Sequence, residues 1–73
     1  MTPGEALAAL RALLDESVAN GDHYIDIPSE IQYVGLGCSP GSPPRRMLVL
    51  QCAATLAFAE HTLTARAMRR LTE

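Results

Sequence analysis

Hydrophobic and polar positions follow a helical period in two long stretches of the chain, and a shorter apolar stretch lies between them. The longest apolar run is 47–59, which contains no charge and only two polar side chains, Gln51 and Thr55. At 100° per residue, the polar positions of this region fall into one narrow stripe, which leaves about two thirds of a helix surface apolar or small. We expect a helix over about 43–71, which starts where Ser42 precedes two prolines.

The apolar surface of this expected helix has two sides. One side gathers Val49, Cys52, Leu56, Leu63 and Ala67, and the other gathers Met47, Leu50, Ala54, Ala57, Phe58 and Met68. A single small partner element cannot cover both sides, so one is expected to face the core of the protein and the other a second chain. The sequence does not tell which side faces inward. His61 falls between Leu50 and Ala54 on the helical wheel and is therefore predicted to be a packed or interface residue.

The first helix is predicted over about 3–19. Thr2 is a good N-cap, Pro3 suits the first helical position, and Glu5 completes a capping box. Its apolar residues share one face and are Ala6, Leu7, Leu10, Leu13, Leu14 and Val18. Asn20-Gly21 ends the helix, because glycine readily adopts the left-handed conformation required after a helix C-terminus.

Between the helices, the segments HYIDI and IQYVGLG are rich in Ile, Tyr and Val, which favours a short β-hairpin over about 23–36. An alternative is that Ser29 caps a short helical turn containing Glu30 and Gln32. The following stretch, 35–44, has three glycines and three prolines and is expected to be a flexible connection. The fold prediction is thus a single α+β domain over 1–73, with two helices and a hairpin between them.

A chain of 73 residues buries only about 60% of its unfolded surface and usually needs a disulfide, a metal or a partner chain for stability. Cys38 and Cys52 are a single pair without zinc-like spacing, and the sequence leaves open whether they form a bridge or stay free thiols. No metal or other cofactor is expected. A partner chain is the remaining support, which predicts a homo-oligomer that also contacts other proteins of an assembly.

Charge is distributed unevenly along the chain. Residues 1–37 contain one arginine and six acidic residues, for −5, whereas 38–73 contain five arginines and two glutamates, for +3. Such asymmetry can orient association with another charged surface, and we expect Arg66, Arg69 and Arg70 to face acidic groups of a neighbouring molecule. The first acidic candidates are Asp15, Glu16 and Asp22 on a copy of this protein. The alternative is two solvated faces of opposite sign.

Few residue patterns here indicate ligand chemistry. Arg45 and Arg46 follow a flexible loop at the expected start of the second helix, where an anion could bind. The chain has no catalytic motif and is not expected to be an enzyme. Its acidic balance argues against nucleic-acid binding, and the thirteen-residue apolar run is shorter than a membrane span. The N-terminus lacks the basic region of a signal peptide, so the protein is expected in the cytoplasm or in a virus particle.

The stretch EALAALRALLDESVANG, followed by HYIDIPSEIQYVGL, resembles the small head-to-tail joining proteins of tailed phages. The likeness consists of a first helix rich in Leu and Ala, a closing glycine, and a hairpin that ends in an apolar-x-Tyr sequence. It covers about residues 5–36. This resemblance implies a non-catalytic joint of a virion that works as a ring of identical copies.

The expected function is therefore that of a non-catalytic, self-assembling structural or connector protein, of phage or phage-derived origin. The alternative is a small inhibitor or regulator that docks on a host protein through its acidic half, as a mimic of nucleic acid. Neither the partner nor the number of subunits follows from the sequence.

Overall fold

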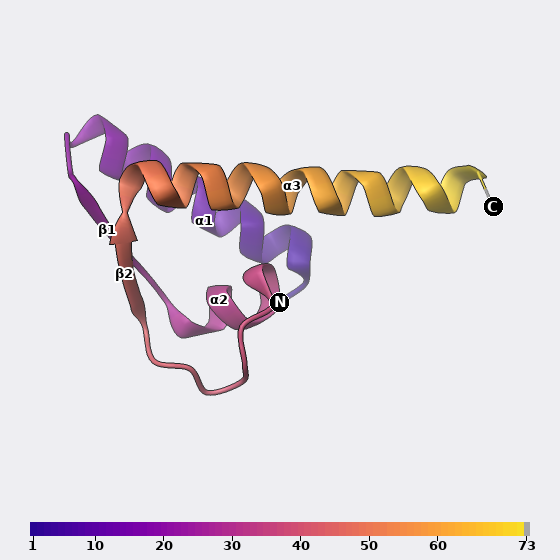
Figure 1. The fold of residues 1–73 in the computed structure, drawn as a ribbon, viewed down its shortest axis with the longest axis horizontal. Coiled ribbons are helices and arrows are strands. Elements are labelled where there is room, and N and C mark those ends of the chain that lie inside the picture. The colour runs from indigo at the N-terminus through magenta and orange to yellow at the C-terminus, as the bar shows by residue number, and fades with distance from the viewer. Residues whose placement is uncertain (73) are drawn as a thin grey trace.

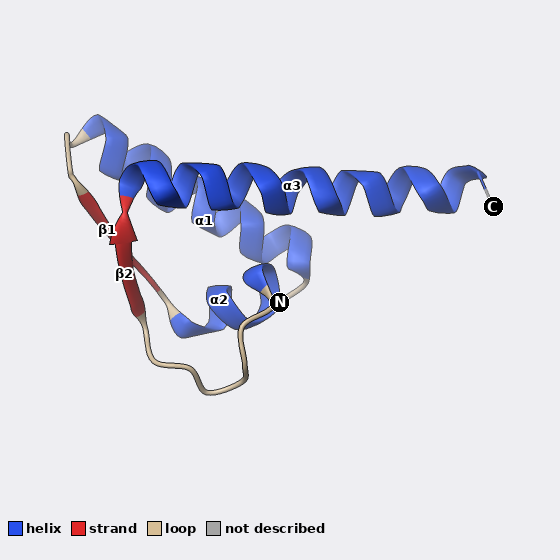
Figure 2. Ribbon diagram, in the orientation of Figure 1, coloured by secondary structure: helices blue, strands red, loops and turns tan. Residues whose placement is uncertain are grey.

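A computed structural model describes residues 1–72, which form three helices and a two-stranded antiparallel sheet (Figures 1 and 2). The elements in chain order are α1 (Pro3–Ala19), β1 (Tyr24–Ile27), α2 (Ser29–Leu36), β2 (Arg45–Leu48) and α3 (Val49–Thr72). The predicted α+β class, with an antiparallel strand pair between the first and last helices, is confirmed. The positions of the second strand and of the last helix start differ from the prediction.

Helix α1 has the predicted bounds because its ends carry strong local signals. The Thr2 hydroxyl accepts a hydrogen bond from the Glu5 N–H at 3.2 Å, and the Glu5 carboxylate accepts one from the Thr2 N–H at 3.0 Å. At the other end, Gly21 has a φ of +74°, and the Asp22 N–H donates to the Ser17 carbonyl at 2.9 Å. This left-handed glycine lets the chain reverse and enter β1.

The segment 31–36 is helical rather than a strand, so the hairpin predicted over about 23–36 is wrong in its second half. The alternative of a short helical turn containing Glu30 and Gln32 is correct, although the helix continues to Leu36. Ser29 is not its cap, because Pro28 occupies the N-cap position and no side chain forms a capping hydrogen bond there. The physical reason is tertiary packing. A Cβ atom added at Gly35 would lie only 3.1 Å from the Cβ atom of Ala6, so α2 lies very close to α1. This close packing overrides the strand preference of Ile, Tyr and Val.

The second strand comes from residues that were predicted to begin a helix. Asp26 pairs with Arg46 and Ile25 with Met47 in the antiparallel register, and the Val49 N–H donates to the His23 carbonyl at 2.9 Å. Helix α3 therefore begins at Val49, immediately after β2, and not at about 43. Four residues that include two arginines give no local strand signal, so only pairing with β1 makes them a strand.

The core lies between α1, the inner side of the sheet and the first half of α3. Its best buried apolar side chains include Leu10, Ile27, Cys52 and Leu56. Alternate positions of β1 are buried, since Ile25 and Ile27 point inward. The core thus combines a helical period on α1 and α3 with a period of two on β1.

The connection between α2 and β2 covers residues 37–44, because Gly35 and Leu36 of the predicted 35–44 connection belong to α2. Gln32 holds this loop. Its side chain is only 2% exposed, and its Nε2 donates to the Pro43 carbonyl at 2.9 Å. A buried side-chain amide on α2 therefore ties down the residues that lead into β2.

Gly35 gives a direct test of the close approach between α1 and α2. Gly35→Ala should lower the free energy of unfolding by about 1 kcal/mol, because its methyl group would lie too close to Ala6 and to Leu7 Cδ2, at 3.3 Å. Gly4, also helical, has no atom nearer than 4.0 Å to an added Cβ, so Gly4→Ala should stabilise the protein by about 0.5 to 1 kcal/mol. Urea unfolding measures both. Equal stabilisation by the two variants would show that α2 can move away from α1 without cost.

Candidate interaction surface

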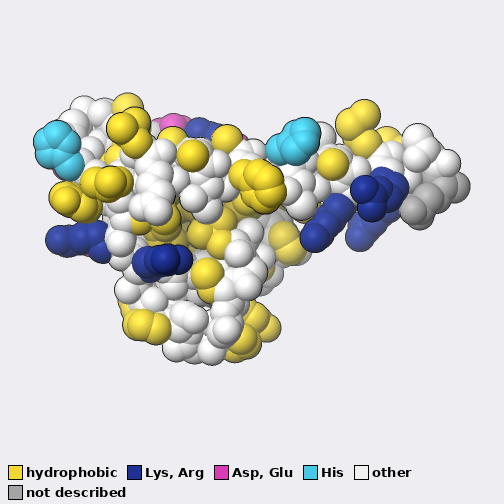
Figure 3. All heavy atoms as spheres, viewed as in Figure 1, with side chains coloured by type: hydrophobic (Ala, Val, Ile, Leu, Met, Phe, Trp, Pro, Cys, Tyr) yellow, Lys and Arg dark blue, Asp and Glu magenta, His cyan; other side chains and the backbone are white. Residues whose placement is uncertain are grey.

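Helix α3 has an apolar outer face that no part of the described chain covers. We define this outer face by Leu50, Ala54, Ala57, Phe58, His61 and Met68, all of which are exposed. The exposed fractions of Leu50, Phe58 and Met68 are 85%, 74% and 62%. Figure 3 shows apolar side chains spread along α3 on the side that faces the viewer. The outer face carries no acidic or basic side chain other than His61, so it is suited to contact with another protein.

The opposite side of α3 is the inner face, which packs in the core. Val49, Cys52 and Leu56 are buried, and Leu63 packs against the core at its edge. The structure thus decides which of the two apolar sides of this helix faces inward. Met47 is a correction to the predicted interface, because it lies on β2, opposite Ile25, and its side chain is buried in the core.

The last part of α3 extends beyond the rest of the molecule (Figure 1). We call residues 64–72 the arm. Every residue of the arm is exposed, including Leu71, at 87%. Leu71 was not among the predicted interface residues. Its exposure results from the length of α3, which continues where α1 has no residues left to cover it.

The accessible surface area of the protein is larger than that expected for a compact monomer of the same mass. It measures 5164 Å², whereas a compact monomer of 7.8 kDa should expose about 4,400 Å². The radius of gyration is 12.9 Å, against about 11 Å for a compact chain of this length. The excess of roughly 800 Å² is similar to the area that one partner buries in a standard protein interface.

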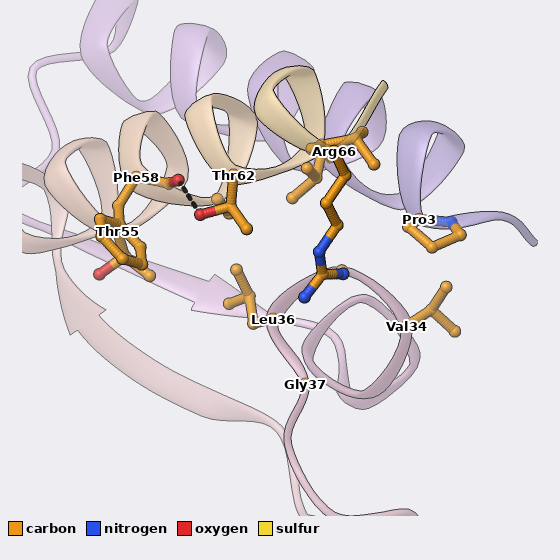
Figure 4. A pocket seen from close by; sticks show the side chains of 12 residues that line it. Pro3, Val34, Leu36, Gly37, Thr55, Phe58, Thr62 and Arg66 are labelled. Atoms are coloured by element: carbon orange, nitrogen blue, oxygen red, sulfur yellow. Dashed lines mark hydrogen bonds between the residues drawn. The ribbon is translucent and has the colours of Figure 1, made fainter. Parts of the chain in front are cut away.

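A hollow of about 320 Å³ lies between the start of α1, the end of α2 and α3 (Figure 4). Leu36 and Val34 of α2 and Phe58 of α3 line it, together with Arg66. In Figure 4 the Arg66 side chain extends from α3 toward the Leu36–Gly37 end of α2. The hollow could take an apolar side chain with a nearby acidic group. Of the three predicted contact arginines, Arg66 therefore borders the body of its own molecule, whereas Arg69 and Arg70 lie farther along the arm.

Within residues 1–72, two ion pairs join elements that are distant in sequence. Arg11 of α1 donates a hydrogen bond to Glu60 of α3, which supports the packing of these helices. Arg46 donates to the two carboxylate oxygens of Asp26, with distances of 2.9 and 3.4 Å, across the strand pair. The hydrogen bond from Arg46 lowers the pKa of Asp26, and the positive charge of Arg46 adds to this effect. The Arg11–Glu60 pair is partly buried and the Asp26–Arg46 pair is exposed, so both stabilise the fold only modestly.

The predicted anion contact at Arg45 and Arg46 depended on their position at a helix N-terminus, and this premise is wrong. Both residues lie on β2, and Arg46 is engaged with Asp26. Arg45 is exposed and borders a second hollow of about 290 Å³ beside Gln32. The Gln32 Oε1 atom in this region accepts no hydrogen bond from residues 1–72.

The cysteines are free thiols and not a disulfide. Cys52 is buried on the inner face of α3, and burial raises the pKa of its thiol. Cys38 lies in the 37–44 loop. Within residues 1–72, side chains of His, Cys, Asp and Glu form no group of three or more that could hold a metal ion. No described helix has the length and apolarity needed to cross a membrane.

Comparisons with protein-family models, with curated proteins and with solved structures found no match for this chain. The interpretation of the surface therefore depends on its own geometry and chemistry.

The Asp26–Arg46 pair predicts an acid dependence of stability. Because the pKa of Asp26 is lowered in the folded protein, its contribution is complete above the unfolded pKa of about 3.9 and is lost as the pH falls through the lower, folded value. Urea unfolding between pH 5 and pH 2 should show a smaller loss of stability for Asp26→Asn than for the wild type. Arg46→Gln should act similarly, and the double variant should add little. Additive effects of the two substitutions would contradict a direct pair.

The two faces of α3 predict different outcomes for the same substitution. Leu56→Asp should unfold the protein, because burying an unpaired carboxylate costs several kcal/mol and a domain of this size has only about 4 to 11 kcal/mol of stability. Leu50→Asp should change the free energy of unfolding by no more than about 0.5 kcal/mol, because Leu50 is exposed. Circular dichroism during thermal unfolding distinguishes them. A Leu50→Asp variant as unfolded as Leu56→Asp would mean that Leu50 contributes to the core.

Proposed function

We propose that this protein is a non-catalytic, self-assembling structural component, a connector that joins copies of itself and other proteins of an assembly. The observation that carries this proposal is the uncharged apolar outer face of α3, with Leu50, Phe58 and Met68 largely exposed. Alanines at 54 and 57 lie between these larger side chains and allow close approach of another helix.

The size of the exposed surface supports a partner chain. Apolar surface contributes about 25 cal/mol per Å² when it is removed from water. If the excess surface of roughly 800 Å² were covered by a second chain, the interface would reach the size of stable protein complexes. The chain is also short, and a partner would add stability that its own small core supplies only in part.

The resemblance of residues 5–36 to joining proteins of tailed phages is consistent with this function, and we propose a phage or phage-derived particle as the setting. Helix α1 and its closing glycine agree with the resemblance. The apolar-x-Tyr segment does not form a hairpin strand in this chain, since 31–36 is helical. The proposal therefore depends mainly on the outer face of α3.

Sizing of the purified protein tests this function. Multi-angle light scattering at micromolar concentration should give a defined multimer for the wild type. Phe58→Asp should give a folded protein of lower mass, because a charge in the centre of the outer face prevents its burial. Tyr33→Asp is a matched control, since Tyr33 is an exposed aromatic residue on α2, and it should leave the mass unchanged.

A wild-type protein that stays a folded 7.8 kDa monomer would contradict self-assembly. If such a monomer instead bound a single host protein tightly through its acidic half, residues 1–37, the function would be that of an inhibitor or regulator.

A further inference from the structure

The arm of α3 has exposed basic and apolar side chains, which suit a partner of opposite charge. Residues 61–72 contain Arg66, Arg69 and Arg70 and no acidic residue, and Glu73, outside the described residues, adds a single acid. Figure 3 shows basic side chains gathered along this part of the helix. Met68 and Leu71 add exposed apolar surface to the same turns. The arm therefore combines apolar contact area with positive charge, and the described chain covers neither.

Two copies of the arm are not complementary to each other, because both are positively charged. Contact between equivalent arms would bring six arginines into one interface, and each close pair of like charges costs about 1 kcal/mol even in water. A symmetric contact of arm with arm is therefore disfavoured. An acidic and apolar surface would complement the arm, and in a neighbouring copy such a surface is a different part of the molecule.

Such a surface lies at the opposite end of the molecule, where α1 ends and the sheet meets the start of α3 (Figure 1). A hollow of about 330 Å³ is lined there by Val18, Asp22, His23, Leu48, Val49 and Leu50. Val18, Leu48 and Leu50 are exposed around it. Asp15 lies one turn before Val18 on the same side of α1. Neither Asp15 nor Asp22 forms an ion pair with a residue of 1–72. We call this surface the acceptor end.

We propose that the arm of one copy docks on the acceptor end of the next, with Leu71 and Met68 against Val18, Leu48 and Leu50. Arg69 and Arg70 flank this apolar side of the helix and would extend from its two edges toward Asp15 and Asp22. This inference rests on the proposed self-assembly and adds the orientation in which neighbouring copies join. The two surfaces are different and lie at opposite ends of an elongated molecule of 43 × 27 × 17 Å. Contacts between unlike surfaces are heterologous and form a ring when the rotation closes, or a filament when it does not. An isologous dimer is not the expected assembly.

Charge reversal tests this polarity. Arg69→Glu with Arg70→Glu, and separately Asp15→Arg with Asp22→Arg, should each raise the concentration for half-assembly about tenfold or more at 50 mM salt. The effect should be much smaller near 1 M salt, where charges are screened beyond about 3 Å. A one-to-one mixture of the two variants, and one chain carrying all four substitutions, should recover assembly, because the charges are again complementary. Arg45→Glu, at the far end of β2 from Leu48, is the control and should assemble like the wild type.

Analytical ultracentrifugation gives the size and the concentration dependence, and circular dichroism checks that each variant is folded. A wild type of three or more subunits whose assembly weakens and recovers in this way supports the proposal. Head-to-tail docking is overturned, but self-assembly is not, if the charge reversals leave assembly of the multimer unchanged. The same conclusion follows if the wild type forms no species larger than a dimer. A wild type that is monomeric at every concentration overturns both.

Discussion

The packing of α1 against the inner face of α3 is the interaction on which the rest of the structure depends. Leu10 of α1 and Cys52 and Leu56 of α3 are completely buried, and the Arg11–Glu60 pair lies at the edge of this contact. Because one side of α3 is used here, its other side must face away from the core. The outer face is therefore a geometric consequence of core packing and not an independent feature.

The difference in length between α1 and α3 has a second consequence. At a rise of about 1.5 Å per residue, the 17 residues of α1 extend about 25 Å and the 24 residues of α3 about 36 Å. The remaining chain forms only a short helix and two four-residue strands, which pack near the start of α3 and beside α1. Nothing in the described chain covers the final turns of α3, so the arm is exposed on all sides. A helix that extends alone into solvent gains little from its apolar residues unless another molecule covers them.

The middle of the chain shows how tertiary contacts can override local preference. Gly35 permits α2 to lie against Ala6, and Gln32 uses its buried amide to hold the backbone at Pro43. These two contacts position the 37–44 loop so that β2 meets β1. The sheet is very small, and the cross-strand Asp26–Arg46 pair and the burial of Met47 contribute to its register.

The sequence by itself determined α1 with both of its ends, the existence of β1, the α+β class and the two-sided apolar character of the last helix. These features depend on local signals, which are caps, glycines, and hydrophobic periods within one element. Only the tertiary structure decided that 31–36 is a helix, that 45–48 is a strand, and that Val49, Cys52 and Leu56 face inward while Leu50 and Phe58 face outward. Each of these outcomes depends on a partner distant in the chain, such as Ala6 for Gly35 or Ile25 for Met47, and a local pattern contains no information about which distant partner a residue meets.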